Sequence, residues 1–405
     1  MEKIQNFING DLIPPKSGGY INNISPATGE VYSLIPDSDA QDIDAAVISA
    51  NTAFKIWSKL SKKERYDHIM HLADIIEEHF DELIKAESRD NGKPEWLARS
   101  VDIPRASENF RFFATASLHF DSEIHEMDGK AINYTLRHPI GVAGCISPWN
   151  LPIYLLTWKI APALAAGNTV VAKPSEMTPM TAYLFSKICQ KANFPKGVIN
   201  IVHGYGNKVG DALTRHPDVP IISFTGGTAT GEKIAAVAAP MFKKLSLELG
   251  GKNPNIVFSD AEFNNAVDMA VKASFSNQGQ ICLCGSRLFI QEDIYDIFKD
   301  AFVKKTEDLK VGDPREKTSN LGAIVSQQHM KKILSKIKQA QDEGGTILTG
   351  GNRFRLNGEL KNGYYIEPTI IEGLPAESKI NHEEIFGPVV CMIPFNSEEQ
   401  VIAMA

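Results

Sequence analysis

Short apolar segments alternate with helix-like segments through the middle of this sequence. The apolar segments have the length of buried strands and cover residues 142–147, 169–173, 198–202, 221–225 and 256–258. The stretches between them, such as residues 155–166 and 178–192, fit helices. Repeated alternation of strand and helix predicts an α/β fold built on a parallel sheet.

The flanking segments predict further helices and strands. Asp39 is a candidate N-cap, and Ser61 with Glu64 forms a capping-box pattern at the start of the following helix. Helices are predicted over residues 39–60, 61–91, 99–120, 261–310 and 326–343, and strands over residues 131–139, 286–290, 346–349 and 388–395.

The composition is that of a globular protein with more than one domain. A chain of 405 residues is too long for one ordinary core, which predicts two or more domains. The net charge of −7 disfavours a nucleic-acid partner, because phosphate binding requires clustered Lys and Arg. Residues 1–13 contain no apolar signal core, and the most apolar stretch, residues 153–166, is too short to cross a bilayer. A soluble protein without a membrane partner is therefore expected.

Five cysteines are spread along the chain. An odd, sparse count is typical of a reducing compartment, so a cytoplasmic location is predicted. Cys282 and Cys284 have no second cysteine pair that could complete a zinc site, so no metal centre is predicted.

Glu248 and Cys282 are the candidate catalytic residues. Glu248 stands beside Gly250 and Gly251, and Cys282 follows a polar, Gly-containing approach over residues 277–281. A thiolate is a strong nucleophile, and a carboxylate can activate water, so the two could form and then hydrolyse a thioester. The alternative is an inert core cysteine and a carboxylate that caps a helix or forms a salt bridge.

Three features suggest a dinucleotide site. Gly204 and Gly206 follow a strand as in a GxGxxG fingerprint, but Val209 replaces the third glycine. The phrase from 224 to 227 follows a strand and opens a helix, where backbone amides suit a pyrophosphate. Lys173 and Glu176, at the end of another strand, could bind ribose hydroxyls or could simply cap that strand. A P-loop is rejected because its lysine position holds a glutamate.

Six phrases in this order resemble motifs of the NAD(P)-dependent aldehyde dehydrogenase superfamily, and the resemblance covers essentially the whole chain. They are Ser147-Pro148-Trp149-Asn150, Lys173-Pro174-Ser175-Glu176, Phe224-Thr225-Gly226-Gly227, Glu248-Leu249-Gly250-Gly251, Gly279-Gln280-Ile281-Cys282 and Glu383-Glu384-Ile385-Phe386-Gly387-Pro388. The family often has Ser where this chain has Gly227.

The resemblance implies a role for each matching residue. Cys282 would be the nucleophile, Glu248 the general base, and Asn150 an oxyanion-hole donor. The cofactor would be NAD, and the residues implied to contact it are Ser147, Trp149, Lys173, Glu176, Gly206, Thr225, Gly226, Gly227, Leu249, Glu384 and Phe386. Because Glu248 can activate water, hydrolysis of the thioester is expected rather than transfer to coenzyme A.

The resemblance also implies an architecture. A Rossmann-like, parallel-sheet NAD-binding domain would comprise residues 1–120 and 140–250, and an α/β catalytic domain residues 251–405. Residues 121–139 would form a bridging and oligomerisation segment, so a homodimer or homotetramer is expected. Family members continue beyond the position of Ala405, so the C-terminal part of the family fold is expected to be missing.

The phrases around residues 102–113, 155–159 and 282–284 further resemble the 2-aminomuconic and 2-hydroxymuconic semialdehyde dehydrogenases. Such substrates carry a carboxylate, and Arg105, Tyr154 and Trp158 are expected to contact the substrate. In the alternative interpretation, Arg105 only bridges its helix to a nearby acid. Two other functions stay open: an aldehyde dehydrogenase for aliphatic or betaine-type aldehydes, and a catalytically silent, truncated cofactor-binding protein.

Overall fold

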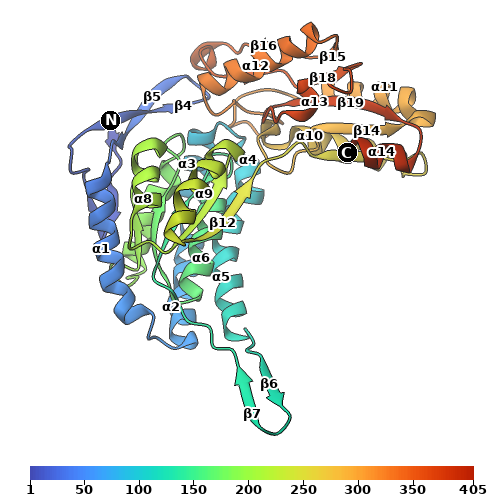
Figure 1. The fold of residues 1–405 in the computed structure, drawn as a ribbon. Helices are drawn as coiled ribbons and strands as arrows, with labels where there is room; N and C mark the ends of the chain where they lie inside the picture. Colours follow the sequence, from blue (N-terminus) through green and yellow to red (C-terminus); the bar gives the residue numbers. More distant parts are fainter. The chain divides into compact units, whose positions relative to one another are not determined.

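The computed structural model describes residues 1–405, which divide into two compact units. Unit 1 comprises residues 1–23, 32–86 and 99–248, and unit 2 comprises residues 24–31, 87–98 and 249–405. Figure 1 shows the course of the chain and labels elements of both units.

The core of unit 1 is a seven-stranded sheet with the order β12-β11-β8-β9-β10-β2-β3. Its strands are β2 (Asn6–Ile8), β3 (Asp11–Ile13), β8 (Val142–Ile146), β9 (Thr169–Lys173), β10 (Ile199–Ile201), β11 (Ile221–Gly226) and β12 (Lys244–Leu249). The pairs β11–β8, β8–β9 and β9–β10 are parallel, and β2 adds to β10 in the antiparallel direction. The α/β fold with a parallel sheet that the sequence predicts is confirmed.

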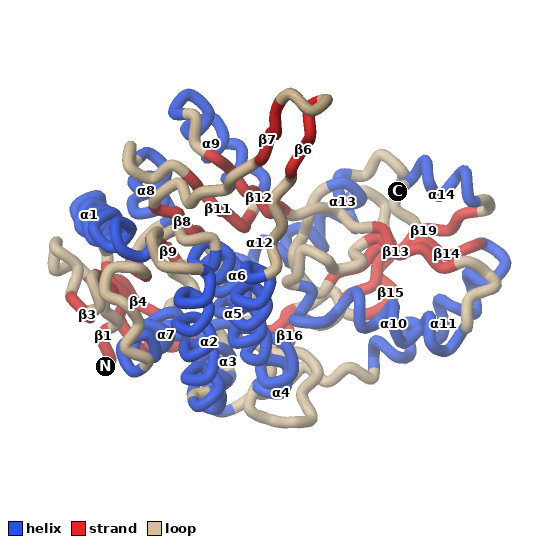
Figure 2. The backbone as a smooth tube through the Cα atoms, turned by 90° about the horizontal axis from the view of Figure 1, so that it is seen from below, coloured by secondary structure: helices blue, strands red, loops and turns tan.

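Helices cover both faces of this sheet (Figure 2). They are α1 (Ala40–Trp57), α2 (Lys62–Glu78), α5 (Ile103–Leu118), α6 (Pro152–Ala165), α7 (Met180–Lys191), α8 (Asp211–Arg215) and α9 (Thr228–Ala238). The buried face of α1, with Ile43 and Val47, packs against sheet residues such as Val142 and Val171 in one apolar cluster. Because β8 and β9 are buried along their whole length, they consist mainly of apolar and small residues rather than alternating polar ones, and the charged Lys173 stands only at the end of β9.

Local capping explains where the first helices begin. Asp39 accepts a hydrogen bond from the backbone N–H of Gln41, and Ser61 and Glu64 form the predicted capping box at the start of α2. The single helix predicted over residues 61–91 is wrong. His79 leaves helical geometry (φ −110°, ψ 14°), so the segment divides into α2 and α3 (Phe80–Asn91).

The helix predicted over residues 99–120 is shorter than expected. A short α4 (Glu95–Leu97) and a π-helical turn (Ala98–Asp102) precede α5. Pro104 lies in the first turn of α5, where its missing N–H costs no helical hydrogen bond.

Unit 2 contains a five-stranded sheet with the order β13-β14-β19-β18-β15. Its strands are β13 (Pro254–Val257), β14 (Arg287–Gln291), β15 (Thr346–Thr349), β18 (Thr369–Glu372) and β19 (Val389–Phe395). Its helices are α10 (Phe263–Phe275), α11 (Tyr295–Glu307), α12 (Gln327–Asp342), α13 (Lys379–His382) and α14 (Glu398–Met404). Aromatic residues of α10 and α11, such as Phe275 and Phe302, form one apolar cluster with β14, and Ile333 and Ile337 of α12 belong to another with β18 and β19.

Two short segments from the N-terminal part of the sequence belong to unit 2, although the domain prediction groups them with residues 1–120. Main-chain hydrogen bonds hold them there. The Pro26 carbonyl accepts from Tyr364 N–H at 3.0 Å, and the Gly92 carbonyl accepts from Ala323 N–H at 2.9 Å. Such long-range pairings cannot be read from local sequence patterns.

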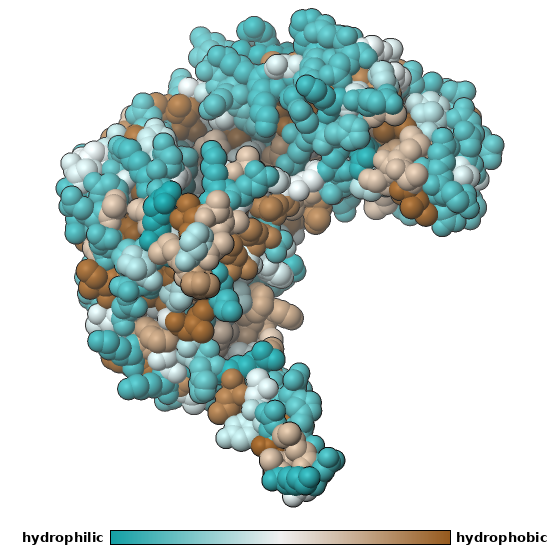
Figure 3. Space-filling view, viewed as in Figure 1, coloured by the Kyte–Doolittle hydropathy of each residue, from teal (hydrophilic) through white to brown (hydrophobic).

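Two smaller sheets complete the strand inventory near the N-terminus and in residues 121–139. Strands β1 (Glu2–Lys3), β4 (Tyr20–Ser25) and β5 (Glu30–Pro36) form one, and β6 (Ile124–Met127) and β7 (Ala131–Tyr134) form a hairpin in which every strand residue is exposed. Figure 3 shows hydrophobic and hydrophilic side chains mixed on this hairpin. In unit 2, β16 (Arg353–Phe354) pairs with β17 (Tyr365–Ile366). No helix has the length and apolar character that a membrane span requires.

Candidate active site

The motif residues of unit 1 gather at the carboxyl edge of its parallel sheet. The strand order places β9 and β10 on one side of β8 and β11 on the other, so the order reverses between β8 and β11. In open α/β sheets, ligands bind in the crevice at such a reversal. Ser147 to Asn150 follow β8 directly, and Thr225 and Gly226 end β11, so both phrases flank this point.

Lys173, Glu176 and Gly206 lie together at the same edge. Lys173 is buried at the end of β9, and its Nζ is 2.6 Å from Glu176 Oε2. A side chain at Gly206 would begin 3.9 Å from that Nζ, so the glycine keeps the approach to the ammonium open. The ion pair leaves the second Glu176 oxygen and further ammonium hydrogens available for hydroxyl groups, as a ribose clamp requires.

The two glycine phrases of unit 1 differ in form. Gly204 has a φ of +143°. The side chain of Val209, which stands at the third glycine position of the fingerprint, packs against Gly204. After β11, by contrast, the chain passes directly through Gly227 into α9, as predicted. A methyl group added at Gly227 would have no neighbour within 4 Å, which leaves the N-terminus of α9 accessible to an anion.

Glu248 is exposed at the end of edge strand β12. Its charge acts on Lys159 of α6, whose Nζ donates to Ser223 Oγ at 3.2 Å. Burial lowers the pKa of Lys159 to about 8, and the charges of Cys145 and Glu248 oppose this shift. Lys159 is not among the residues predicted from the sequence, although a lysine inside the apolar stretch 153–166 is a signal that could have found it.

Arg105 of α5 meets Tyr154 and Trp158 of α6. Its Nη2 donates to the Tyr154 hydroxyl at 3.2 Å, and its Cζ lies 5.1 Å and 5.9 Å from the centroids of the Tyr154 and Trp158 rings. Glu108 Oε2 is 3.5 Å from Arg105 Nη1. The Arg105 side chain is 43% exposed, so it is stable without a further partner and can still accept one.

In unit 2, Cys282 lies in the loop between α10 and β14. This loop begins with three consecutive left-handed residues: Asn277 (φ +50°), Gln278 (φ +57°) and Gly279 (φ +68°). The Gly279 Cα packs directly on the Gly387 carbonyl, where an added methyl group would overlap the backbone. The approach to Cys282 is therefore packed against the loop that holds Glu384 and Phe386.

Glu384 and Phe386 are fixed by contacts inside unit 2. Glu384 lies over Gly250, where a larger residue would overlap its carboxylate, and burial raises the pKa of Glu384. Phe386 has a left-handed backbone (φ +60°), and its carbonyl is 2.7 Å from His329 Nε2. Burial lowers the pKa of His329 to about 4, so the ring is neutral at pH 7 and its Nε2–H donates to this carbonyl.

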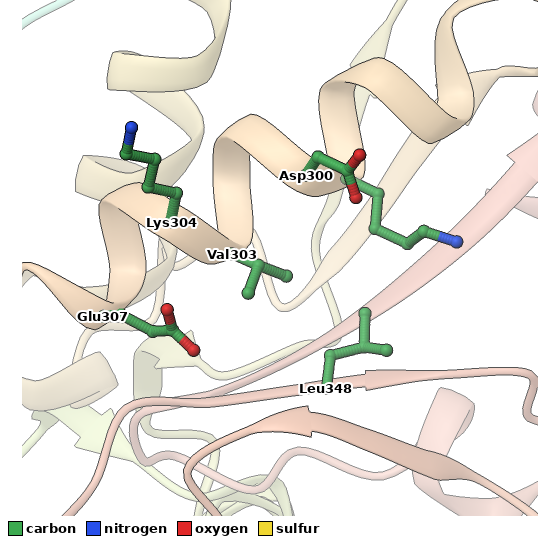
Figure 4. A pocket seen from close by; sticks show the side chains of 6 residues that line it. Asp300, Val303, Lys304, Glu307 and Leu348 are labelled. Atoms are coloured by element: carbon green, nitrogen blue, oxygen red, sulfur yellow. The ribbon is translucent and has the colours of Figure 1, made fainter.

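The structure therefore gathers the predicted residues into groups within each unit. Unit 1 holds the cofactor phrases, Asn150, Glu248 and the Arg105 group, whereas unit 2 holds Leu249, Cys282, Glu384 and Phe386. The cavity of about 290 Å³ in Figure 4 contains none of them: charged side chains of α11, such as Lys304 and Glu307, line it with Leu348 of β15.

Residues 13–405 match the aldehyde dehydrogenase family. The chain is a member of this family. It is 51% identical over 405 residues to 2-aminomuconic semialdehyde dehydrogenase from Mus musculus, an alignment that covers 99% of this chain and 83% of the mouse protein. It is 43% identical to 2-hydroxymuconic semialdehyde dehydrogenase from Pseudomonas sp. (strain CF600), over 100% of this chain and 85% of that protein.

Solved structures of aldehyde dehydrogenases have the same fold. The NAD⁺ complex of the Bacillus cereus enzyme superposes with a TM-score of 0.96 at 39% identity, covering 100% of this chain and 82% of that one. Betaine aldehyde dehydrogenase from Staphylococcus aureus, also solved with NAD⁺, gives a TM-score of 0.94 at 35% identity over 99% of this chain and 79% of that one. The predicted family is confirmed.

Proposed function

We propose that this aldehyde dehydrogenase oxidises a carboxylate-bearing, muconic-type semialdehyde to the acid with NAD. The observation that carries the substrate class is the similarity to the two muconic semialdehyde dehydrogenases, which exceeds the 35% identity to the betaine aldehyde dehydrogenase. The reaction class rests on family membership together with the presence of Cys282, Glu248 and Asn150.

The residues at the carboxyl edge of the unit 1 sheet fit NAD. Ser147 Oγ is buried there without a hydrogen-bond partner, and Gly227 opens α9 with free space around it. Lys173 and Glu176 would hold the adenosine ribose, and the backbone from Thr225 to Gly227 would receive the pyrophosphate. Ser147, Trp149 and Gly206 would line the path of the cofactor, and Leu249, Glu384 and Phe386 would contact its nicotinamide half. When bound, the cofactor accepts the hydride released from the substrate carbon.

The protein residues act in two stages. In the first, the Cys282 thiolate attacks the aldehyde carbon, and the Asn150 amide and the Cys282 backbone N–H donate hydrogen bonds to the oxyanion. Loss of hydride leaves a thioester on Cys282. In the second, Glu248 takes a proton from water, which attacks the thioester and releases the acid. Cys282 belongs to unit 2, and Asn150 and Glu248 belong to unit 1.

Two variants test the reaction. Cys282→Ala should abolish NADH formation in the steady state and in a single turnover, because no thiohemiacetal can form. Glu248→Gln should still give a burst of NADH and then stall at the thioester, because only hydrolysis needs the base. Rapid-mixing absorbance of NADH measures both. Substantial activity in Cys282→Ala would refute the nucleophile, and equal loss of burst and steady state in Glu248→Gln would assign Glu248 a role before hydride transfer.

We further propose that the chain forms a homo-oligomer in the cytoplasm. The exposed β6–β7 hairpin, within residues 121–139, supports a homodimer or homotetramer, because its two strands pair only with each other and its apolar side chains are exposed. A cytoplasmic location is supported by the sparse, odd number of cysteines.

A further inference from the structure

The backbone that leads to Cys282 is strained. Asn277 and Gln278 both have left-handed φ angles, which are unfavourable for L-residues. Strain of this kind persists only where surrounding contacts fix the conformation. The contacts that fix this loop lie on both sides of the cysteine and come from side-chain amides.

Upstream of Cys282, two glutamines tie the loop to residues 322–325. The Gln278 side chain donates to the Ala323 carbonyl at 3.2 Å and accepts from Gly322 N–H at 3.3 Å. Gln280 Oε1 accepts from Val325 N–H at 3.1 Å. Both glutamines are buried, so these bonds are shielded from water and hold residues 278–280 firmly.

Downstream, one side chain holds the loop. Asn253 Nδ2 donates to the carbonyl of Cys282 at 2.5 Å and to the carbonyl of Cys284 at 3.1 Å. An amide NH₂ has two hydrogens, so both bonds form at once. The backbone of Asn253 is itself anchored, because its backbone carbonyl accepts a hydrogen bond from the Arg287 N–H at 3.1 Å, where β14 begins.

We infer that Asn253 is a positioning residue for the Cys282 thiol, an inference that rests on the proposed nucleophilic role of Cys282. The direction of the Cys282 carbonyl is set by ψ of that residue. With residues 278–280 fixed upstream, holding this carbonyl also fixes the peptide frame that carries Cβ and Sγ, and the backbone N–H proposed for the oxyanion. A second hydrogen bond to Cys284 prevents the loop from turning about Leu283. Asn253 therefore orients the nucleophile without touching the substrate.

Asn253→Asp and Asn253→Ser test this role. Aspartate has the same shape but places acceptor oxygens against two carbonyls, whereas serine is too short to span both. The burst rate constant for NADH at saturating aldehyde and NAD should fall about 10-fold or more in Asn253→Asp, because small misplacements of reacting groups carry large rate penalties. KM for the aldehyde should stay within about twofold, since ground-state binding is not affected.

Alkylation of Cys282 by iodoacetamide separates orientation from folding. A small, free reagent can approach the thiol from many directions, so the labelling rate should stay within about threefold of wild type while the burst falls. Labelling is followed by mass spectrometry of the peptide containing Cys282. The matched control is Asn264→Asp, at an exposed position of α10, which should keep wild-type burst and labelling.

Three outcomes would overturn the inference. A wild-type burst in both Asn253 variants would show that the two hydrogen bonds do not matter for the reaction. A burst and a labelling rate that fall together would assign Asn253 a general structural role, as would a melting temperature that drops in parallel with activity in the milder Asn253→Ser. Failure of the proposed function is recognised separately, because Cys282→Ala would then retain its NADH burst whatever the Asn253 variants do.

Discussion

At the scale of single residues, the question for Arg105 is whether it determines substrate specificity or has only a structural role. Its side chain is 43% exposed beside Tyr154 and Trp158, and Glu108 Oε2 lies 3.5 Å from its Nη1. An exposed ion pair within one helix contributes little to stability. Because the Arg105 side chain is also partly exposed, its charge needs no substrate carboxylate to compensate for burial. Its specificity role therefore depends on the carboxylate that a substrate would bring.

Arg105→Ala should raise KM for 2-hydroxymuconic semialdehyde about 10-fold or more, as expected when a charge-assisted hydrogen bond of about 1.5–3 kcal/mol is lost. KM for hexanal, which has no carboxylate, should barely change. Steady-state kinetics on both aldehydes provide the comparison, and Arg99→Ala, at an exposed ion pair with Asp81, is a charge-matched control. Equal losses on both substrates would assign Arg105 to structure.

His203 should make the protein sensitive to acid. It is buried in unit 1 with neither ring nitrogen hydrogen-bonded, and burial together with the charge of Lys173 lowers its pKa to about 3. The folded pKa lies below the ordinary 6.5, so the unfolded chain binds the extra proton. The stability contribution is therefore complete above about pH 6.5 and falls as the pH decreases toward 3.

Between pH 7 and pH 4.5 this group should remove about 2–3 kcal/mol from the free energy of unfolding. His203→Leu should lose that part of the pH dependence, whereas His138→Leu, at an exposed position, should retain the wild-type slope. Urea unfolding at several pH values measures both. An unchanged slope in His203→Leu would mean that His203 is protonated, or solvated, in the folded protein.

At the scale of elements, the sequence predicts what is set by neighbours along the chain. Asp39, Ser61 and Glu64 cap helices through bonds to residues two or three positions away, so their patterns are legible. The left-handed turn at Asn277 and Gln278 is not, because residues 322–325 hold it from far along the chain. For the same reason, the sequence does not predict the contact between Gly250 and Glu384 or the hydrogen bonds from Asn253 to the Cys282 loop.

Gly279 should be the least replaceable glycine of that turn. An added methyl group would meet both a left-handed φ of +68° and the Gly387 backbone, which cannot move without shifting the loop of Glu384 and Phe386. Gly279→Ala should cost more than about 3 kcal/mol of unit 2 stability, as strain and overpacking combine.

Gly373→Ala measures the cost of the left-handed φ without the overlap with a neighbouring backbone. Gly373 has a similar φ of +74° in the same unit, but an added methyl group would meet nothing within 4 Å. Its replacement should therefore cost only about 1–2 kcal/mol. Thermal and urea unfolding compare the two variants, and equal losses would show that the approach to Gly387 relaxes easily.

At the scale of the whole molecule, the sequence predicted the α/β class and the family but not how the chain divides. Residues 24–31 and 87–98 join unit 2 through main-chain hydrogen bonds to residues 323 and 364. Such bonds depend on backbone position rather than on side-chain type, so composition contains no sign of them. The ordered motifs, by contrast, identify the family because each keeps particular residues together in the sequence. Four of the six end or directly follow the strands β8, β9, β11 and β12.

We expect the β6–β7 hairpin to form the contact through which whole chains associate. Ile124 and Ile132 are 70% and 69% exposed, Met127 and Tyr134 are also exposed, and a lone two-stranded hairpin is only marginally stable in water.

Ile124→Asp with Ile132→Asp should therefore weaken a homodimer or homotetramer, because burying two carboxylates at an interface is costly. Sedimentation velocity should show a smaller species for the double variant, whereas Ile48→Asp, at an exposed position of α1, should sediment as wild type. Since Ile124 and Ile132 contribute nothing to the core of unit 1, its melting temperature should change only through the loss of association. An unchanged assembly in the double variant would exclude the hairpin as the contact between chains and would mean that another surface forms it.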